Sequence, residues 1–229
     1  MNYYFIVYGL TIISLLITLF AQCFVNFSYK KYLKVKNERK ITGANAARYI
    51  LDKHNLNNIK IVETSGYLTD HYDPKKKVIR LSSSVYNDTS IASVSVACHE
   101  CGHAIQDSEN YIFLKIRSKL VWVVNLSSYA GYFSILFGCI FGSLNLIWLG
   151  IFAEVIILLF QIITLPVEIN ASKRALKELD YAHFFNSKEL KQGKIMLTSA
   201  ALTYVASIAT NLIQILRLIL LYGRKDRNR

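Results

Sequence analysis

Four long hydrophobic segments constrain the fold of this chain more than any other feature of its sequence. They cover residues 3–27, 120–141, 146–167 and 195–222, and each is long enough to cross a bilayer as a helix. Backbone polar groups in lipid must form their hydrogen bonds within the segment, so all four segments are predicted to be helical. Hydrophobic residues make up 53% of the 229 residues, which agrees with a mainly α-helical membrane protein.

Basic residues predict the orientation of the chain in the membrane. The first hydrophobic segment is followed directly by Lys30, Lys31, Lys34, Lys36, Arg39 and Lys40. By the positive-inside rule, the N-terminus is expected outside and the chain from residue 30 onward in the cytoplasm. The first segment has no preceding basic region or small-residue cleavage site, so it is predicted to be an anchor and not a secretory signal. The net charge is +12, and the basic residues cluster beside hydrophobic segments, where they would contact anionic lipid. No nucleic-acid partner is therefore expected.

The other three segments predict a hairpin followed by a final helix. Turn residues at Gly142–Asn145 separate the two middle segments, and a hairpin of two spans returns the chain to the face that it left. Residue 168 and the residues after it are therefore expected on the same side as residues 41–118. The last segment contains Arg217 and many hydroxyl residues. It is predicted either to cross the membrane packed on other helices or to lie along the interface, which leaves the side of the C-terminus open.

The polar part between the first two segments is predicted to form a small α+β portion. Thr42 can cap a helix over 43–54, and alternating residues predict strands over 59–63 and 77–82. The stretch 66–74 is rich in turn residues and is predicted to be a loop. If the second strand lies at the sheet edge, it could pair with an extended peptide.

Residues 99–103 read His-Glu-Cys-Gly-His, within a predicted helix that has candidate capping residues at 87–90 and continues to about Gln106. Two histidines four residues apart on a helix lie one turn apart, so His99 and His103 can bind one tetrahedral Zn²⁺. The neighbouring Glu100 is placed to accept a proton from water at such a metal. This H-E-x-x-H pattern is typical of zinc-dependent peptidases.

A catalytic zinc needs a third protein ligand, and Glu168 is the preferred candidate. It follows the predicted hairpin and heads a predicted helix on which Ala171, Ser172 and Ala175 would allow close approach to the zinc helix. Glu154 is the alternative acid, but fourteen helical residues before Glu168 correspond to about 21 Å, which places it near the middle of the membrane. The histidines His54, His71 and His183 are the remaining candidates.

Two further features are predicted to be structural. Cys98 and Cys101 lie on the zinc helix but are expected to pack beside the site and not to bind the metal or form a redox pair. An ionised Glu154 is costly at membrane depth, so this residue is expected to be hydrogen-bonded or protonated, with Gln161, Asn125 or a polar residue of the last helix as its partner.

Four sequence stretches in combination resemble the bacterial membrane-bound neutral zinc metallopeptidases of the YugP-like group. They are L-T-D-H-Y-D-P (Leu68–Pro74), V-A-C-H-E-C-G-H-A-I-Q (Val96–Gln106), L-P-V-E-I-N-A-S-K-R-A-L (Leu165–Leu176) and L-T-Y-V-A (Leu202–Ala206). A looser similarity links the chain to the HtpX and CaaX-type membrane peptidases, whose glutamate ligand lies in an E-x-x-A-D motif. Here the corresponding residues are Glu168, Ala171 and Ser172, so a serine stands where the motif has aspartate. Ser172 or Asn170 is therefore expected to make the contact that the aspartate makes in those peptidases.

Together these features predict a zinc endopeptidase of the gluzincin type. Residues 1–229 are expected to form one membrane-embedded domain, with cytoplasmic parts at 41–118 and 168–194. The resemblance implies an integral protein of a bacterial plasma membrane, with membrane-associated proteins or peptides as substrates. The positive-inside rule and the hairpin predict that its active site faces the cytoplasm. The candidates for stabilising the oxyanion are His71, Tyr72 and His183.

The alternative prediction is a non-catalytic membrane scaffold with a structural or lost zinc site. A purely structural site has no use for an acid beside its ligand, so the presence of Glu100 favours the enzyme.

Overall fold

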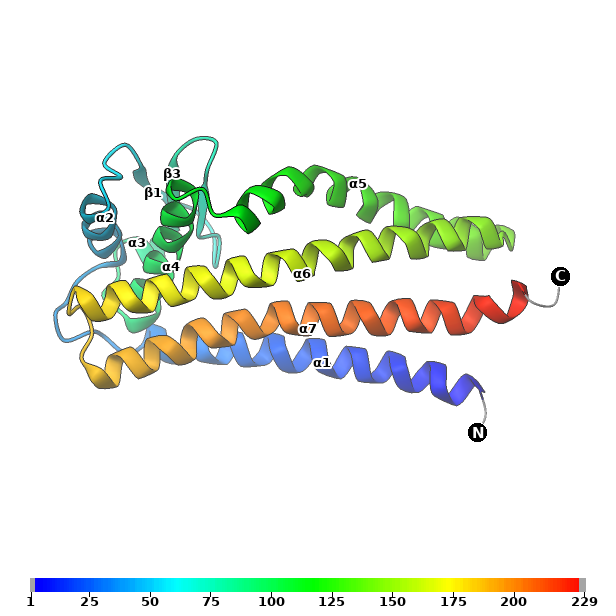
Figure 1. Ribbon diagram of the computed structural model, residues 1–229. Coiled ribbons are helices and arrows are strands. Elements are labelled where there is room, and N and C mark those ends of the chain that lie inside the picture. Colours follow the sequence, from blue (N-terminus) through cyan, green and yellow to red (C-terminus); the bar gives the residue numbers. More distant parts are fainter. Residues whose placement is uncertain (1–2, 227–229) are drawn as a thin grey trace. The chain divides into compact units, whose positions relative to one another are not determined.

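The computed structural model describes residues 3–226 and consists mainly of α-helices with one small sheet (Figure 1). The chain divides into two compact units. The helical unit comprises the chain up to Gln22, Lys115–Leu165 and the chain from Thr203 onward. The sheet unit comprises Cys23–Leu114 and Pro166–Leu202.

Four long helices confirm the predicted hydrophobic segments. Within the described residues, four helices are long and apolar enough to cross a membrane. They are α1 (Tyr3–Leu33), α5 (Ile112–Phe141), α6 (Leu144–Tyr181) and α7 (Ser187–Asp226). Gly142 has a positive φ of 65° between α5 and α6, a conformation that glycine adopts without strain, as expected for the predicted turn.

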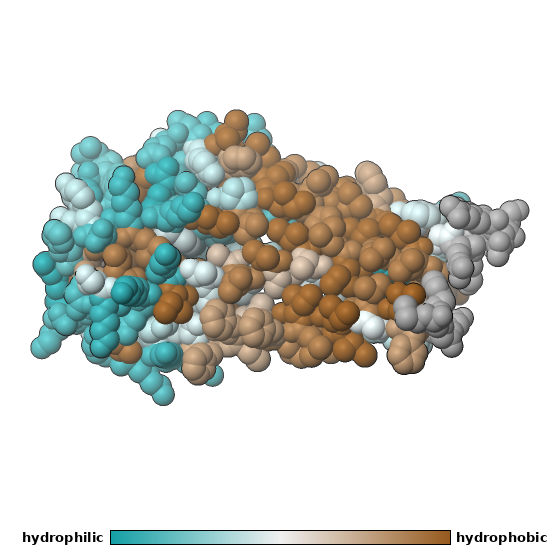
Figure 2. Space-filling view, turned by 60° about the horizontal axis from the view of Figure 1, so that its bottom comes forward, coloured by the Kyte–Doolittle hydropathy of each residue, from teal (hydrophilic) through white to brown (hydrophobic). Residues whose placement is uncertain are grey.

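The surface of the helical unit suits lipid better than water. Large apolar side chains such as Phe20, Trp122 and Tyr129 are exposed on its helices. Figure 2 shows hydrophobic residues covering the region of these helices, whereas hydrophilic residues gather over the region of the sheet. A contiguous apolar surface of this kind marks contact with a membrane.

Helix α6 differs from the prediction at its middle. A separate helix headed by Glu168 was expected, but one helix continues through Pro166 to Tyr181. A proline in a helix interior removes one backbone hydrogen bond, yet helices packed on neighbouring helices tolerate it. The apolar segment and Glu168 therefore lie on the same helix.

The sheet of the sheet unit has the strand order β1-β3-β2. Strand β1 (Lys60–Thr64) runs parallel to β3 (Val78–Ser82), and both were predicted. Strand β2 (His71–Asp73) pairs antiparallel with β3 inside the stretch predicted to be a loop. Strand β3 is therefore central and its two edges are occupied, so the prediction that it could receive a substrate as an edge strand is wrong. Strand β2 was missed because its three residues are too few to show the alternation of apolar and polar side chains that indicates a strand.

Three helices complete the sheet unit. Helix α2 (Gly43–Lys53) begins at Thr42, whose side chain accepts a hydrogen bond from the backbone N–H of Asn45, as predicted. The four-residue helix α3 (Ser83–Tyr86) was not predicted. Helix α4 (Ile91–Ser108) begins at Ser90, whose hydroxyl accepts from the backbone of Ser93. The core of this unit includes the fully buried Ile50, Leu51, Ile79, Leu81 and Ile91.

Candidate metal centre

Helices α4 and α6 bring together two histidines and one glutamate. His99 and His103 lie one turn apart on α4, and Glu168 reaches them from α6. The Nε2 atom of His99 lies 3.3 Å from Oε2 of Glu168, and Nε2 of His103 lies 3.6 Å from the same oxygen. One possible ligand atom from each side chain lies within 4.8 Å of the others, so this group could bind a metal ion.

Close packing of α4 against α6 positions these side chains. A Cβ atom on Gly102 would lie 2.5 Å from the backbone oxygen of Ala171, so only glycine fits without a shift. Ala171 and Ala175 are 0% and 1% exposed, which confirms the predicted close approach of their face of α6. Glycine at position 102 therefore allows the two helices to approach closely beside the histidines.

The electrostatics of the group favour a cation. His103 and Glu168 are 8% and 4% exposed. Burial opposes a positive charge on His103, but the nearby negative charges of Glu168 and Glu100 outweigh it, so the pKa of His103 is raised. Two imidazole nitrogens and one carboxylate are also the ligands of many catalytic zinc sites, which keep a fourth position open. The donor set and its charge therefore fit Zn²⁺.

Each histidine is held at its other ring nitrogen. The Nδ1 atom of His99 lies 3.1 Å from Oγ of Ser172, and Nδ1 of His103 lies 3.0 Å from Oε1 of Gln106. Both rings therefore present Nε2 toward Glu168. Ser172 was one of the two residues proposed to replace an aspartate contact. Gln106 was not singled out, although its position three residues after His103 on one helix was a usable signal.

A chain of hydrogen bonds determines which nitrogen of His103 carries hydrogen. Arg174 has only donors, and its Nε donates to Oδ1 of Asn170 at 2.8 Å. Gln106 donates to that same oxygen at 2.9 Å and to the carbonyl of Val167 at 2.8 Å. The amide oxygen of Gln106 is then left to accept from Nδ1–H of His103, so the lone pair of Nε2 remains free for a metal.

Three other residues with predicted roles at the site form different contacts. His71 is exposed on β2, and its Nδ1 lies 2.8 Å from a backbone oxygen two residues earlier. The hydroxyl of Tyr72 donates to Asp107 at 2.7 Å, and burial together with this bond raises the tyrosine pKa. His183 follows the end of α6, and the helical residues between Glu168 and that end span about 20 Å. The structure therefore does not bring His183 to the group.

The two cysteines of α4 pack in the core, as predicted. Cys98 and Cys101 are 1% and 0% exposed, and the thiol of Cys101 points to the backbone oxygen of Ala47 at 3.6 Å. Burial raises the pKa of both thiols, which disfavours the thiolate form required of a metal ligand.

Comparison with known proteins identifies the family. The model of a family described as "Putative neutral zinc metallopeptidase" matches residues 7–223. The chain belongs to this family. A relative from Bacillus subtilis (strain 168), described as "Putative membrane protease YugP", is 43% identical over 220 residues, which are 96% of this chain and 98% of that protein. No solved structure matches the chain.

Family membership confirms the resemblance drawn from the sequence motifs. It implies Zn²⁺ as the cofactor of this chain, and His99, His103 and Glu168 form a group with suitable donors. The membrane-protease relative and the four apolar helices together indicate a membrane protein.

Proposed function

We propose that this chain is a membrane-integrated zinc endopeptidase in which His99, His103 and Glu168 hold the metal. The observation that carries the proposal is the convergence of the three side chains, with one possible ligand atom from each within 4.8 Å of the others. Membership in the zinc metallopeptidase family supports the same conclusion.

Glu100 is the proposed general base and later the general acid. A bound Zn²⁺ would lower the pKa of a water molecule toward neutrality and polarise the peptide carbonyl. Glu100 would accept the proton of the attacking water and then deliver it to the leaving amine. Its side chain is buried, with 7% of the residue exposed, and within residues 3–226 its carboxylate has no hydrogen bond or ion pair. An acid beside the metal group that accepts no hydrogen bond has a clear use in catalysis and none in a purely structural zinc site, which favours the enzyme over a scaffold.

The proposed orientation places the metal group at the cytoplasmic face. The basic residues from Lys30 to Lys40 belong to the chain just after the first apolar segment, and the positive-inside rule assigns them to the cytoplasm. His99 and Glu168 belong to the same compact unit as these basic residues. Membrane-associated proteins with cytoplasmic or interfacial cleavage sites are therefore the proposed substrates.

Metal removal and return test the proposed function. The detergent-purified full chain is expected to contain about one zinc per chain and to cleave fluorescein-labelled casein. Treatment with 1,10-phenanthroline should abolish cleavage, and added Zn²⁺ should restore it, because the metal supplies the activation of water. Absence of zinc even after reconstitution, measured by mass spectrometry of the metal, would favour a non-catalytic scaffold.

Gln106→Leu is expected to lower zinc affinity by roughly 10–100-fold, the usual effect of losing a partner that orients a metal-binding histidine. Leucine has similar volume but cannot accept from Nδ1 of His103, so that ring loses its fixed tautomer. Competition with a fluorescent chelator measures the affinity. The matched control is Ser108→Ala, which removes a local hydrogen bond to Ile105 on the same helix. Equal affinities in both variants would contradict the proposed role of Gln106.

A further inference from the structure

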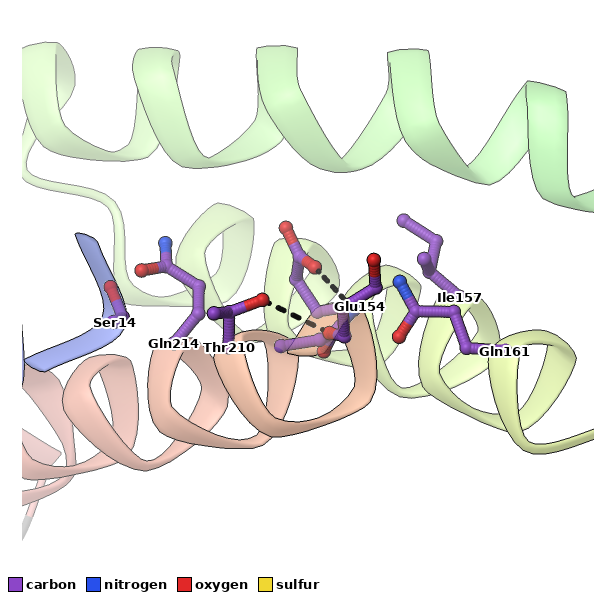
Figure 3. A pocket seen from close by; sticks show the side chains of 8 residues that line it. Ser14, Glu154, Ile157, Gln161, Thr210 and Gln214 are labelled. Carbon is purple, nitrogen blue, oxygen red and sulfur yellow. Dashed lines mark hydrogen bonds between the residues drawn. The ribbon is translucent and has the colours of Figure 1, made fainter. Parts of the chain in front are cut away.

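A polar pocket lies within the helical unit, among segments that suit lipid. Its volume is about 430 Å³, and residues of α1, α6 and α7 line it. Among the eight lining residues only Ile157 has an apolar side chain. Figure 3 shows Glu154 and Gln161 of α6 together with Thr210 and Gln214 of α7. The volume falls within the range of about 300–1,000 Å³ found for small-molecule sites.

Glu154 has one partner in this pocket. Nδ2 of Asn211 donates to its carboxylate at 3.3 Å, which confirms the prediction of a partner from the last helix. Over the described range of the chain, Glu154 forms no ion pair. The nearest basic residue along α7, Arg217, does not line the pocket, and its guanidinium donates to Thr11 at 3.0 Å. An acid at membrane depth without a cation is costly and therefore marks a functional site.

The other polar groups of the pocket also offer oxygen atoms. Asn211 is 8% exposed, and its Oδ1 has no hydrogen-bond partner; Oε1 of Gln161 has none either. The hydroxyls of Ser14 and Thr210 donate to backbone oxygens of their own helices, so each oxygen has lone pairs left with which it can accept a further hydrogen bond. The amides of Gln161 and Gln214 can also donate, but the lining holds one acid and no basic residue, so a cation with several hydrogen-bond donors complements it best.

We propose that this pocket binds a protonated amine or a guanidinium group. Such a cation carries several N–H donors and no acceptor, and its charge complements Glu154. The cation could come from a lysine or arginine in the membrane-spanning segment of a protein substrate, or from a free alkylamine. Only the first source rests on the proposed peptidase function.

Binding of hexylammonium to the full chain in phosphatidylcholine nanodiscs tests the pocket, with neutral hexanol as the reference for partition into lipid. Glu154→Gln keeps the size of the side chain, and it should weaken hexylammonium binding at least about tenfold. Asn211→Leu should weaken it as well. The matched control is Ser128→Ala on α5, outside the pocket, which should bind like the unmodified protein.

A second arm uses a polyleucine membrane-spanning peptide with one central lysine, compared with the all-leucine peptide. Binding of the lysine peptide alone would identify a substrate segment as the source, and binding of hexylammonium alone would identify a free amine. Unchanged binding in Glu154→Gln, or equally tight binding of hexanol, would overturn the proposal. Zinc content is measured in the same samples, so failure of the pocket and failure of the peptidase proposal are distinguishable.

Discussion

Glu168→Ala is expected to reduce the zinc content of the purified protein from about one to below about 0.2 per chain. Glu168 contributes the one carboxylate of the group. Its Oε2 lies 3.3 Å from Nε2 of His99 and 3.6 Å from Nε2 of His103. Two imidazoles alone fall short of the three protein ligands that catalytic zinc sites require. The loss also removes the negative charge that favours a cation beside His103. Metal analysis by mass spectrometry after gel filtration measures the result.

The chain offers a closely matched control for this experiment. Glu178 lies on the same helix, is 7% exposed, and also has a histidine partner, with its carboxylate 2.9 Å from Nε2 of His54 and 2.7 Å from Nζ of Lys53. Glu178→Ala should lower the thermal unfolding temperature but keep the zinc. Full zinc in a folded Glu168→Ala variant would move the third ligand to another residue.

Most of the fold could be predicted because long apolar segments allow few structures. Lipid excludes unpaired backbone groups, so segment length alone predicted the four long helices. Local capping chemistry at Thr42 likewise predicted the start of α2. The prediction failed where tertiary packing decides the structure. Strand β2 exists only by pairing with β3, and α6 continues through Pro166, where a proline normally ends a helix.

In the candidate site too, some residues could be predicted from the sequence and others could not. His99 and His103 were evident because helical spacing alone places them one turn apart. Glu168 could be inferred because a hairpin returns the chain to the face that it left. The hydrogen bonds from Gln106 to Asn170 and Val167 join residues more than sixty positions apart. No periodicity in the sequence predicts such pairs, and only the packing of α4 on α6 reveals them.

Glu100→Gln is expected to reduce casein cleavage by roughly 10²–10⁴-fold while the zinc content stays near one per chain. Glutamine has nearly the same size as glutamate but cannot take a proton from water at neutral pH. Glu100 is not a member of the group that could hold the metal, so its charge is not needed to retain zinc by coordination. A loss confined to the proton-transfer step should lower kcat and leave KM nearly unchanged.

The comparison that decides the role of Glu100 is between activity and metal content in the same samples. Glu63→Gln is the control, because Glu63 is an exposed acid on β1 and its replacement should leave both quantities unchanged. Activity within about tenfold of the unmodified protein in Glu100→Gln would assign the general base to another residue. A parallel loss of zinc would show instead that Glu100 supports the metal or the fold. Loss of cleavage with full zinc separates proton transfer from metal binding, and a structural zinc site cannot produce that result.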